Sequence, residues 1–425
     1  MTSVTYRSVM SSHDVSAGFV EATWKARGKD SFERSWNLPE LGVGVSWTDQ
    51  SAVAFNGWDQ RLDDLYALYA VMRRDFGRGE RVRFGYDFDL GTAYTGNVFD
   101  FSDGYNWYYG THFVCFVQAG AHVGVSLSPR VEALAEARVM HASNGRLGYP
   151  NQGMNFAGVG VGLRYSFGGC GAARGLIHTP SMSEDPCGVR GSGVSSERVG
   201  SSSLCERPRS SQMNCGTMPL KDQGSGVQSE AHAGGTDSAF GRVKISPDEY
   251  RRGWSLEIQA GGGVHTCGTE FVATYRCGDS PSTYSGLRRW PKASVSADIL
   301  YRYSGRWSTG VIADLFYSSN TSALKGFDTT IYGSDAVASS KGYAPFSTGV
   351  GIVQMLHYKN VCAVLSPAVY IYRRMGIRDD HGMIYNRAGL RWYIHGGPFY
   401  VGAVIKAQPF KAEYFDFHVG WRLPS

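Results

Sequence analysis

One short segment of the chain, residues 139–155, gathers residue types that can hydrolyse an ester. His141 and Ser143 lie two positions apart, and Asn144 and Gly145 follow directly. A serine hydroxyl is a weak nucleophile at neutral pH and needs an adjacent base. A histidine two residues away on the same strand face can be that base, accepting the hydroxyl proton and returning it to the leaving alcohol. Asn144 and the backbone N–H of Gly145 are then placed to receive an oxyanion.

A third residue completes this arrangement. Asn155 lies across a loop rich in Gly, Asn and Pro from His141 and Ser143. From there its side chain could hold the imidazole in one tautomer, as the third member of a catalytic triad does. These groups require neither a metal ion nor a cofactor, and we expect none.

The same residues have a plainer interpretation, because short motifs often match by chance. His141 and Ser143 could be polar residues at the level of the lipid headgroups, and Asn144–Gly145 could be an ordinary turn. The residue types alone leave both interpretations open.

The elements around these residues predict where the side chains point. Residues 130–143 alternate in polarity, and the charged residues Arg130, Glu132, Glu136 and Arg138 share one parity. The other parity holds small apolar residues, and it also holds His141 and Ser143. Asn155 shares its parity with the apolar residues of the following strand. In a membrane barrel all three side chains would therefore project toward lipid, where polar groups are costly unless they are used.

The rest of the chain shows the same period of two. Apolar and polar residues alternate over ten or more residues in 81–90, 112–128 and 414–423, which is long for a strand of a soluble sandwich. The chain contains 25 Tyr, 21 Phe and 55 Gly, residues that favour strands and turns over helices. No run of about 18 apolar residues suggests a transmembrane helix. The sequence predicts an all-β protein, an antiparallel transmembrane β-barrel, with a soluble all-β sandwich as the alternative.

Connection lengths support the barrel. Tight turns at 128–130, 305–306, 359–360 and 396–398 alternate with longer connections at 96–111, 144–154, 268–292, 320–342 and 376–383. Outer-membrane barrels have short periplasmic turns and long outer loops. Counting from residue 41 gives six strands before a Ser/Gly-rich stretch and eight after it. We therefore predict one barrel of about 14 strands, within a range of 12–16.

The chain divides into four segments on this basis. Residues 1–40 are predicted to be an N-terminal extension, and 41–167 the first half of the barrel with the active site. Residues 168–252 are a Ser/Gly-rich insert that we predict to be disordered, and 253–425 are the second half of the barrel. Four of the eight cysteines lie in the insert, where disulfides and free thiols are both open. The first 13 residues lack the apolar stretch of an export signal, so either that signal lies upstream of the printed start or the protein is not exported, and we favour the first.

Charge excludes one class of partner. The net charge is only +5 for 425 residues, without a concentrated basic stripe, so we do not expect nucleic acid as a partner. The expected partner is a membrane lipid. The oligomeric state does not follow from the sequence.

The segment "HASNG", followed by "PNQGMN", resembles the lipid A deacylase family, also known as the acyloxyacyl hydrolase-like group. This resemblance implies a barrel in the outer membrane of a Gram-negative bacterium that acts on lipid A or lipopolysaccharide. It implies His141 as the base, Ser143 as the nucleophile, and Asn144 with Gly145 as the oxyanion hole. The family's acidic position falls on Asn155, a departure from the pattern. An Asn carbonyl can still accept from a ring N–H, and Cys-His-Asn sites are functional.

The resemblance covers residues 58–167 closely and extends to the C-terminal tail. Residues 387–423 are similar to the end of longer, two-part relatives, with a "KAQPFKAE" run from Lys406 to Glu413. We therefore predict an outer-membrane esterase that removes an ester-linked acyl chain from lipid A or a related envelope lipid. The alternative is a non-catalytic outer-membrane barrel, a pore or a scaffold, that retains the motif.

Overall fold

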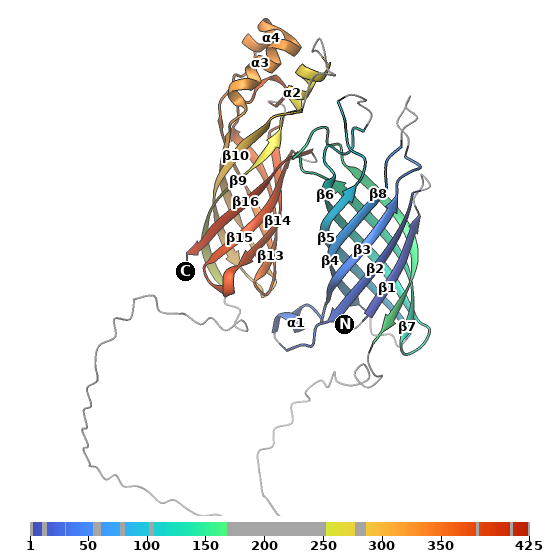
Figure 1. Cartoon of the computed structure of the whole chain (residues 1–425). Coiled ribbons are helices and arrows are strands. Elements are labelled where there is room, and N and C mark those ends of the chain that lie inside the picture. Colours follow the sequence, from blue (N-terminus) through green and yellow to red (C-terminus); the bar gives the residue numbers. More distant parts are fainter. Residues whose placement is uncertain are drawn as a thin grey trace, which may run out of the picture. The chain divides into compact units, whose positions relative to one another are not determined.

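The chain folds into two β-barrels (Figure 1). The computed structural model describes residues 3–10, 15–29, 31–53, 61–76, 81–101, 106–167, 252–276, 286–379, 382–408 and 411–423. Sixteen strands lie in these ranges, and every strand is antiparallel to its neighbours, in two closed barrels of eight. The predicted all-β, antiparallel barrel class is confirmed, and the strand number is at the upper limit of the predicted range. The prediction of a single barrel was wrong.

The first barrel begins earlier in the chain than predicted. Its strands are β1 (Ser3–Met10), β2 (Ser16–Lys25), β3 (Glu40–Asp49), β4 (Leu65–Phe76), β5 (Val82–Thr95), β6 (Phe113–Ser126), β7 (Val131–Ser143) and β8 (Met154–Ser166). Residues 1–40, predicted as an extension, hold β1, β2 and helix α1 (Ser31–Ser35). Strand β2 was missed because its lumen-facing side mixes apolar and charged residues. Phe19 and Glu21 are both buried there, so polarity does not follow parity.

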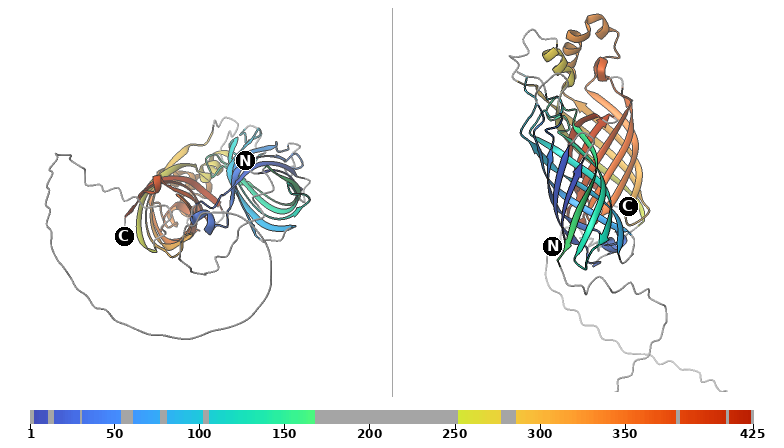
Figure 2. Two further views of the ribbon diagram at one scale, coloured as in Figure 1. Left: turned by 90° about the horizontal axis from the view of Figure 1, so that it is seen from below. Right: turned by 90° about the vertical axis from the view of Figure 1, so that its right-hand side faces the viewer.

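The second barrel is closed by its own strands. These are β9 (Gly253–Thr266), β10 (Arg289–Arg302), β11 (Trp307–Ser318), β12 (Phe346–Tyr358), β13 (Val361–Tyr372), β14 (Ile384–Tyr393), β15 (Phe399–Gln408) and β16 (Lys411–Leu423). Strand β9 pairs with β16, and β1 pairs with β8, so each barrel forms a complete ring (Figure 2, left). A period of two shows which side of a strand faces lipid but not which strand is its neighbour. The segments 41–167 and 253–425 are therefore not two halves of one barrel.

The helices lie mostly in the connections that were predicted to be long. They are α2 (Gly268–Phe271), the π-helix η1 (Val272–Arg276), α3 (Thr321–Tyr332), α4 (Ser334–Ala338) and α5 (Gly376–Asp379), with a 3₁₀ turn η3 (Ile394–Gly396) in a short connection. Helices α2 to α4 lie at one end of the second barrel (Figure 1). None of the helices in the described ranges is long and apolar enough to cross a membrane.

The outer wall of both barrels is apolar. Val159, Val161 and Phe417, which project outward, are 68%, 69% and 63% exposed. Alternating strands with an apolar exterior and a polar interior are typical of barrels that lie in lipid. We call the end of each barrel that carries the long connections the loop end, and the opposite end the turn end.

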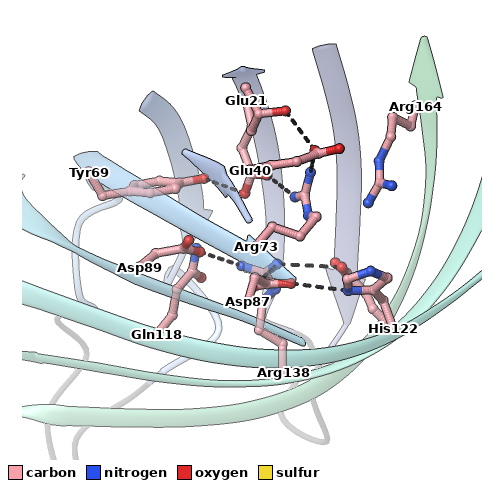
Figure 3. A network of polar contacts seen from close by, with 12 residues as sticks. Glu21, Glu40, Tyr69, Arg73, Asp87, Asp89, Gln118, His122, Arg138 and Arg164 are labelled. Carbon is pink, nitrogen blue, oxygen red and sulfur yellow. Dashed lines mark hydrogen bonds and ion pairs between the residues drawn. The ribbon is translucent and has the colours of Figure 1, made fainter. Parts of the chain in front are cut away.

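Polar side chains inside the first barrel form a network of hydrogen bonds and ion pairs (Figure 3). Arg138 is buried and pairs with Asp87 at 2.7 Å and with Asp89 at 3.1 Å. Above and beside this cluster Arg73 pairs with Glu21, and both side chains are completely buried. An eight-stranded barrel is just wide enough for its side chains to fill it. The lumen is therefore a packed core, polar around Arg138 and Arg73 and apolar around Phe19, Tyr69 and Phe116.

The described strands of both barrels belong to one compact unit. At the turn end the indole N–H of Trp36, just after α1, donates to the His357 carbonyl at 3.0 Å. Beside it Lys359 pairs with Glu33 of α1 at 2.7 Å. The Ser/Gly-rich insert with its four cysteines lies outside the described residues, apart from Arg252.

Candidate active site

Strands β7 and β8 form the hairpin that carries the predicted site. They pair in antiparallel register, with His141 directly opposite Asn155. Glu136 and Arg138 of β7 are buried in the lumen, and Val139 is 56% exposed on the outer wall. Since strand residues two apart share a face, His141 lies on the outer side at the loop end of the first barrel.

The structure brings the three predicted residues together in one hydrogen-bonded chain. His141 Nε2 lies 2.9 Å from Ser143 Oγ, and His141 Nδ1 lies 2.8 Å from Asn155 Oδ1. An amide oxygen can only accept a hydrogen bond, so Nδ1 carries the proton in this arrangement. Nε2 then carries no proton, and its lone pair can accept the Ser143 hydroxyl proton.

Solvent exposure differs among the three hydrogen-bonded residues. Asn155 is exposed, His141 is half-buried, and Ser143 is only 4% exposed. Gly153 lies directly against the serine, because a Cβ at this position would be 2.9 Å from Ser143 Cβ. Gly153 also has a positive φ of 66°, which glycine adopts most easily. A side chain at position 153 would displace the proposed nucleophile.

The connection after Ser143 is shaped by Asn144. The Asn144 backbone N–H donates to Asn151 Oδ1 at 3.0 Å, and its side-chain Nδ2 donates to the Gly148 carbonyl at 3.1 Å. Its Oδ1 accepts from the Arg146 N–H at 2.9 Å. Asn144 is 1% exposed. These contacts place Asn144 inside the loop, where it holds the loop's shape.

The backbone N–H of Gly145 differs from that of Asn144 in its hydrogen bonding. It has a positive φ of 59°, and within the described ranges its backbone N–H donates to no partner. A donor left open beside Ser143 is what an oxyanion requires. Of the two residues predicted as oxyanion donors, Gly145 is the one whose backbone N–H has no partner in the described ranges, while the Asn144 N–H donates to Asn151.

Two further residues that contact the site had no assigned chemistry in the sequence analysis. Asn151 accepts from the Asn144 N–H, and Gly153 makes room for Ser143. Both belong to the "PNQG" motif, so the sequence marked these two residues as part of a motif without showing what they contact. Their roles depend on how the loop folds back on Ser143, which residue spacing does not show.

A groove of about 650 Å³ lies on the outer wall next to the triad. Its lining is made mostly of small residues: Ala119, Gly120, Ala121, Ala137, Arg138, Val139, Ala157, Gly158 and Val159. Val139 pairs across the strands with Ala119 and Ala157, and it lies two residues from His141. The groove therefore begins one side-chain layer below the triad and continues down the wall.

The described part of the chain contains no group of three or more His, Cys, Asp or Glu side chains that could hold a metal ion. The polar groups that the structure brings together at the site are Ser143, His141, Asn155 and the loop after Ser143. Their arrangement can transfer a proton from a serine hydroxyl to an imidazole and present a backbone N–H to a developing negative charge.

Two family descriptions match the chain. The family "Lipid A 3-O-deacylase (PagL)" matches residues 17–164, and "Acyloxyacyl hydrolase, C-terminal domain" matches residues 254–425. No curated protein matches the chain. Among solved structures, the outer membrane enzyme PagL is 12% identical, with 39% of this chain and 99% of that chain covered and a TM-score of 0.28. Neisserial surface protein A is 16% identical, with 39% and 94% covered and a TM-score of 0.24.

Proposed function

We propose that this chain, an outer-membrane β-barrel protein of the lipid A deacylase family, hydrolyses an ester-linked acyl chain of lipid A by Ser/His catalysis. The observation that carries the proposal is the hydrogen-bonded chain from Ser143 through His141 to Asn155. It lies on the apolar outer wall, where the acyl part of a membrane lipid lies beside the barrel.

In the first half of the reaction Ser143 Oγ attacks the ester carbonyl. His141 Nε2 takes the hydroxyl proton, and the carbonyl oxygen becomes an oxyanion next to the Gly145 N–H. When this intermediate collapses, the bond between the carbonyl carbon and the sugar oxygen breaks. His141 gives its proton to that oxygen, so the sugar leaves as an alcohol and the acyl chain stays on Ser143.

In the second half a water molecule releases the fatty acid. His141 Nε2 accepts a proton from the water, and the resulting hydroxide attacks the acyl carbonyl. The second intermediate collapses with Ser143 as the leaving group, and His141 returns the proton to Oγ. Only protein groups and water take part, so the proposal needs no cofactor.

Asn155 orients the imidazole in this scheme. Its carbonyl oxygen accepts from Nδ1, which leaves Nε2 toward Ser143 in the tautomer that catalysis needs. An amide has no charge with which to stabilise the imidazolium, so the rate is expected to be lower than with a carboxylate at this position. The geometry of a triad is kept, and part of its electrostatic stabilisation is lost.

The groove below the triad supports a lipid as the substrate. Its small, apolar lining would take an acyl chain lying along the wall, with the ester at the level of Ser143. The matching family is named for the 3-O position, so the 3-O-linked chain of lipid A is the first substrate to test.

The other candidate is a non-catalytic barrel. The absence of a carboxylate at position 155 favours it, because this charge normally supports the histidine. A pore is the weaker form of this candidate, because side chains fill the first barrel's lumen. A scaffold that retains the motif is the stronger form.

Mass spectrometry of lipid A incubated with the refolded protein tests the proposal. We expect the wild type to remove one acyl mass and Ser143→Ala to remove none. Ser166→Ala, at the other end of the same hairpin, is the matched control and should act like wild type. Unchanged lipid A with all three proteins, each shown to be folded, would favour the scaffold.

A further inference from the structure

The loop that follows Ser143 is held from outside by the second barrel. Thr266, the last residue of β9, donates both its backbone N–H and its hydroxyl to the Arg146 carbonyl, at 2.9 and 3.0 Å. Thr266 is 3% exposed. The Arg146 carbonyl lies two peptide groups after the Gly145 N–H, so these two bonds hold the loop close to the proposed oxyanion donor.

A second contact lies on the other side of the same loop. Phe271 of α2 is completely buried, and its ring lies 4.9 Å from Tyr149 and 5.3 Å from Trp107, centroid to centroid. Tyr149 belongs to the loop after Ser143, and Trp107 belongs to the connection between β5 and β6. The Trp107 carbonyl accepts from the Gln152 N–H at 3.2 Å. Phe271 therefore packs where the two loops that surround the triad meet.

A third contact is the ring of Phe415 in β16. A Cβ on Gly145 would lie 2.3 Å from Phe415 Cε2, so this ring sits directly against the Gly145 backbone. Any side chain at position 145 would collide with it. Contacts from β9, α2 and β16 thus converge on residues 145–149.

Hydrogen bonds within the first barrel also hold this loop. The hydrogen bonds of Asn144 to Asn151 and Gly148 close the loop on itself without tying Gly145 to a strand. An oxyanion donor must be in place before the reaction, because its advantage depends on not having to reorganise. Within the loop, the carbonyl of the peptide that carries the Gly145 N–H accepts from the Leu147 N–H at 3.1 Å, and the contacts with the second barrel add support from outside the loop.

We infer that the second barrel is a positioning element for the active site of the first, and that Thr266 and Phe271 are positioning residues. They hold the Gly145 N–H where the oxyanion forms. This inference rests on the proposed esterase function. It gives the second barrel a role in turnover although the hydrogen-bonded triad lies entirely in the first.

Steady-state kinetics of the full-length variants on lipid A test the inference. For Phe271→Ala we expect kcat to fall by about 10- to 100-fold, the cost of a small misplacement of a catalytic group, with KM changed by less than about threefold. For Thr266→Val, which keeps the shape but removes one donor, we expect a fall in kcat of about fivefold. Thr266→Ser keeps the hydroxyl and should restore the wild-type kcat.

Two matched variants of the second barrel separate positioning from general loss of stability. Phe316→Ala removes a buried ring that contacts Tyr370 and Tyr385, and Thr309→Val removes a hydroxyl that donates to Gln354. Both should retain the wild-type kcat while migrating as folded protein on unheated gels. Equal losses in Phe271→Ala and Phe316→Ala, or wild-type kcat in both Phe271→Ala and Thr266→Val, would overturn the inference. An inactive wild type would instead reject the proposed function itself.

Discussion

The final hairpins of the two barrels place their polar residues on opposite sides of the wall. In β7–β8 of the first barrel His141 and Asn155 face outward at the loop end. In β15–β16 of the second barrel Lys406 and Glu413 face inward, are 1% and 6% exposed, and pair at 2.6 Å. A shift of one residue along a strand moves a side chain to the other face. The position of a polar residue along the strand, odd or even, therefore decides whether its side chain faces the membrane lipid or forms ion pairs in the lumen.

The Lys406–Glu413 pair also explains the "KAQPFKAE" run of the tail. Lys406 donates to Glu413 and to the Tyr370 hydroxyl, each at 2.6 Å. Lys292 approaches Glu413 from β10 at 3.5 Å. The run thus supplies an ion cluster inside the second barrel, whereas "HASNG" and "PNQGMN" supply groups outside the first.

The largest expected effect is on the free energy of unfolding and comes from the buried ion pairs. Both barrels have such pairs in the lumen. Arg138→Ala would leave Asp87 and Asp89 buried without their guanidinium, and Arg391→Ala would do the same to Asp298, while Glu257 would keep Arg422. Breaking a buried pair by removing one partner costs about 3–5 kcal/mol. We expect each change to lower the free energy of unfolding by about this amount in denaturant titrations followed by Trp fluorescence.

The two arginine variants should differ in activity. Arg138 lies on the strand that carries Ser143, so Arg138→Ala should also slow the labelling of Ser143 by a fluorophosphonate. Arg391→Ala, in protein that is still folded, should leave labelling close to wild type. A slower reaction in Arg391→Ala alone would contradict this division between the barrels.

A smaller effect is expected from the amide that orients His141. Asn155→Ala should lower kcat by about 100-fold, because the imidazole loses the partner that fixes its tautomer. Asn155→Asp should raise kcat, by roughly tenfold, because a carboxylate adds charge stabilisation to an already correct geometry. Asn386→Ala, an outward residue of β14 in the second barrel, is the control and should change neither kcat nor KM. A lower kcat in Asn155→Asp would show that the amide is preferred.

The smallest effect concerns the groove. Ala137→Trp should fill it and lower kcat/KM about tenfold for an ester with a long acyl chain, with little change for a butyryl ester. Val161→Trp places the same side chain on the same wall outside the groove, opposite Ala135. Hydrolysis assays with p-nitrophenyl esters of both lengths compare the two variants. Equal losses on both esters would indicate that the groove does not hold the acyl chain.

The direction of the site residues could be predicted from the sequence. Arg138 and Val139 differ in polarity, and that contrast at neighbouring positions places the two faces of β7 without a structure. The same rule carries to His141, because it depends only on strand geometry. The direction of a side chain depends only on its own strand, so this prediction stays correct although the number of barrels was predicted wrongly.

Features that depend on distant partners could not be predicted. The pairing of β8 with β1 rather than β9 creates two barrels from one alternating pattern. Asn144 stays a predicted oxyanion donor, and the sequence did not show that its side chain also holds the loop through the Gly148 carbonyl. The contact of Thr266 with Arg146 joins residues 120 positions apart, and neither residue type predicts it.

The separate closure of each barrel limits how far apart in sequence the closing strands lie. The closing pairs join Ser3 to Ser166 and Leu256 to Leu423, so neither ring has to bring the two ends of the whole chain together. Folding slows as contacts become more distant in sequence, and two shorter closures keep them nearer. The triad needs only the first ring to close, whereas the support from Thr266 and Phe271 needs the second ring as well.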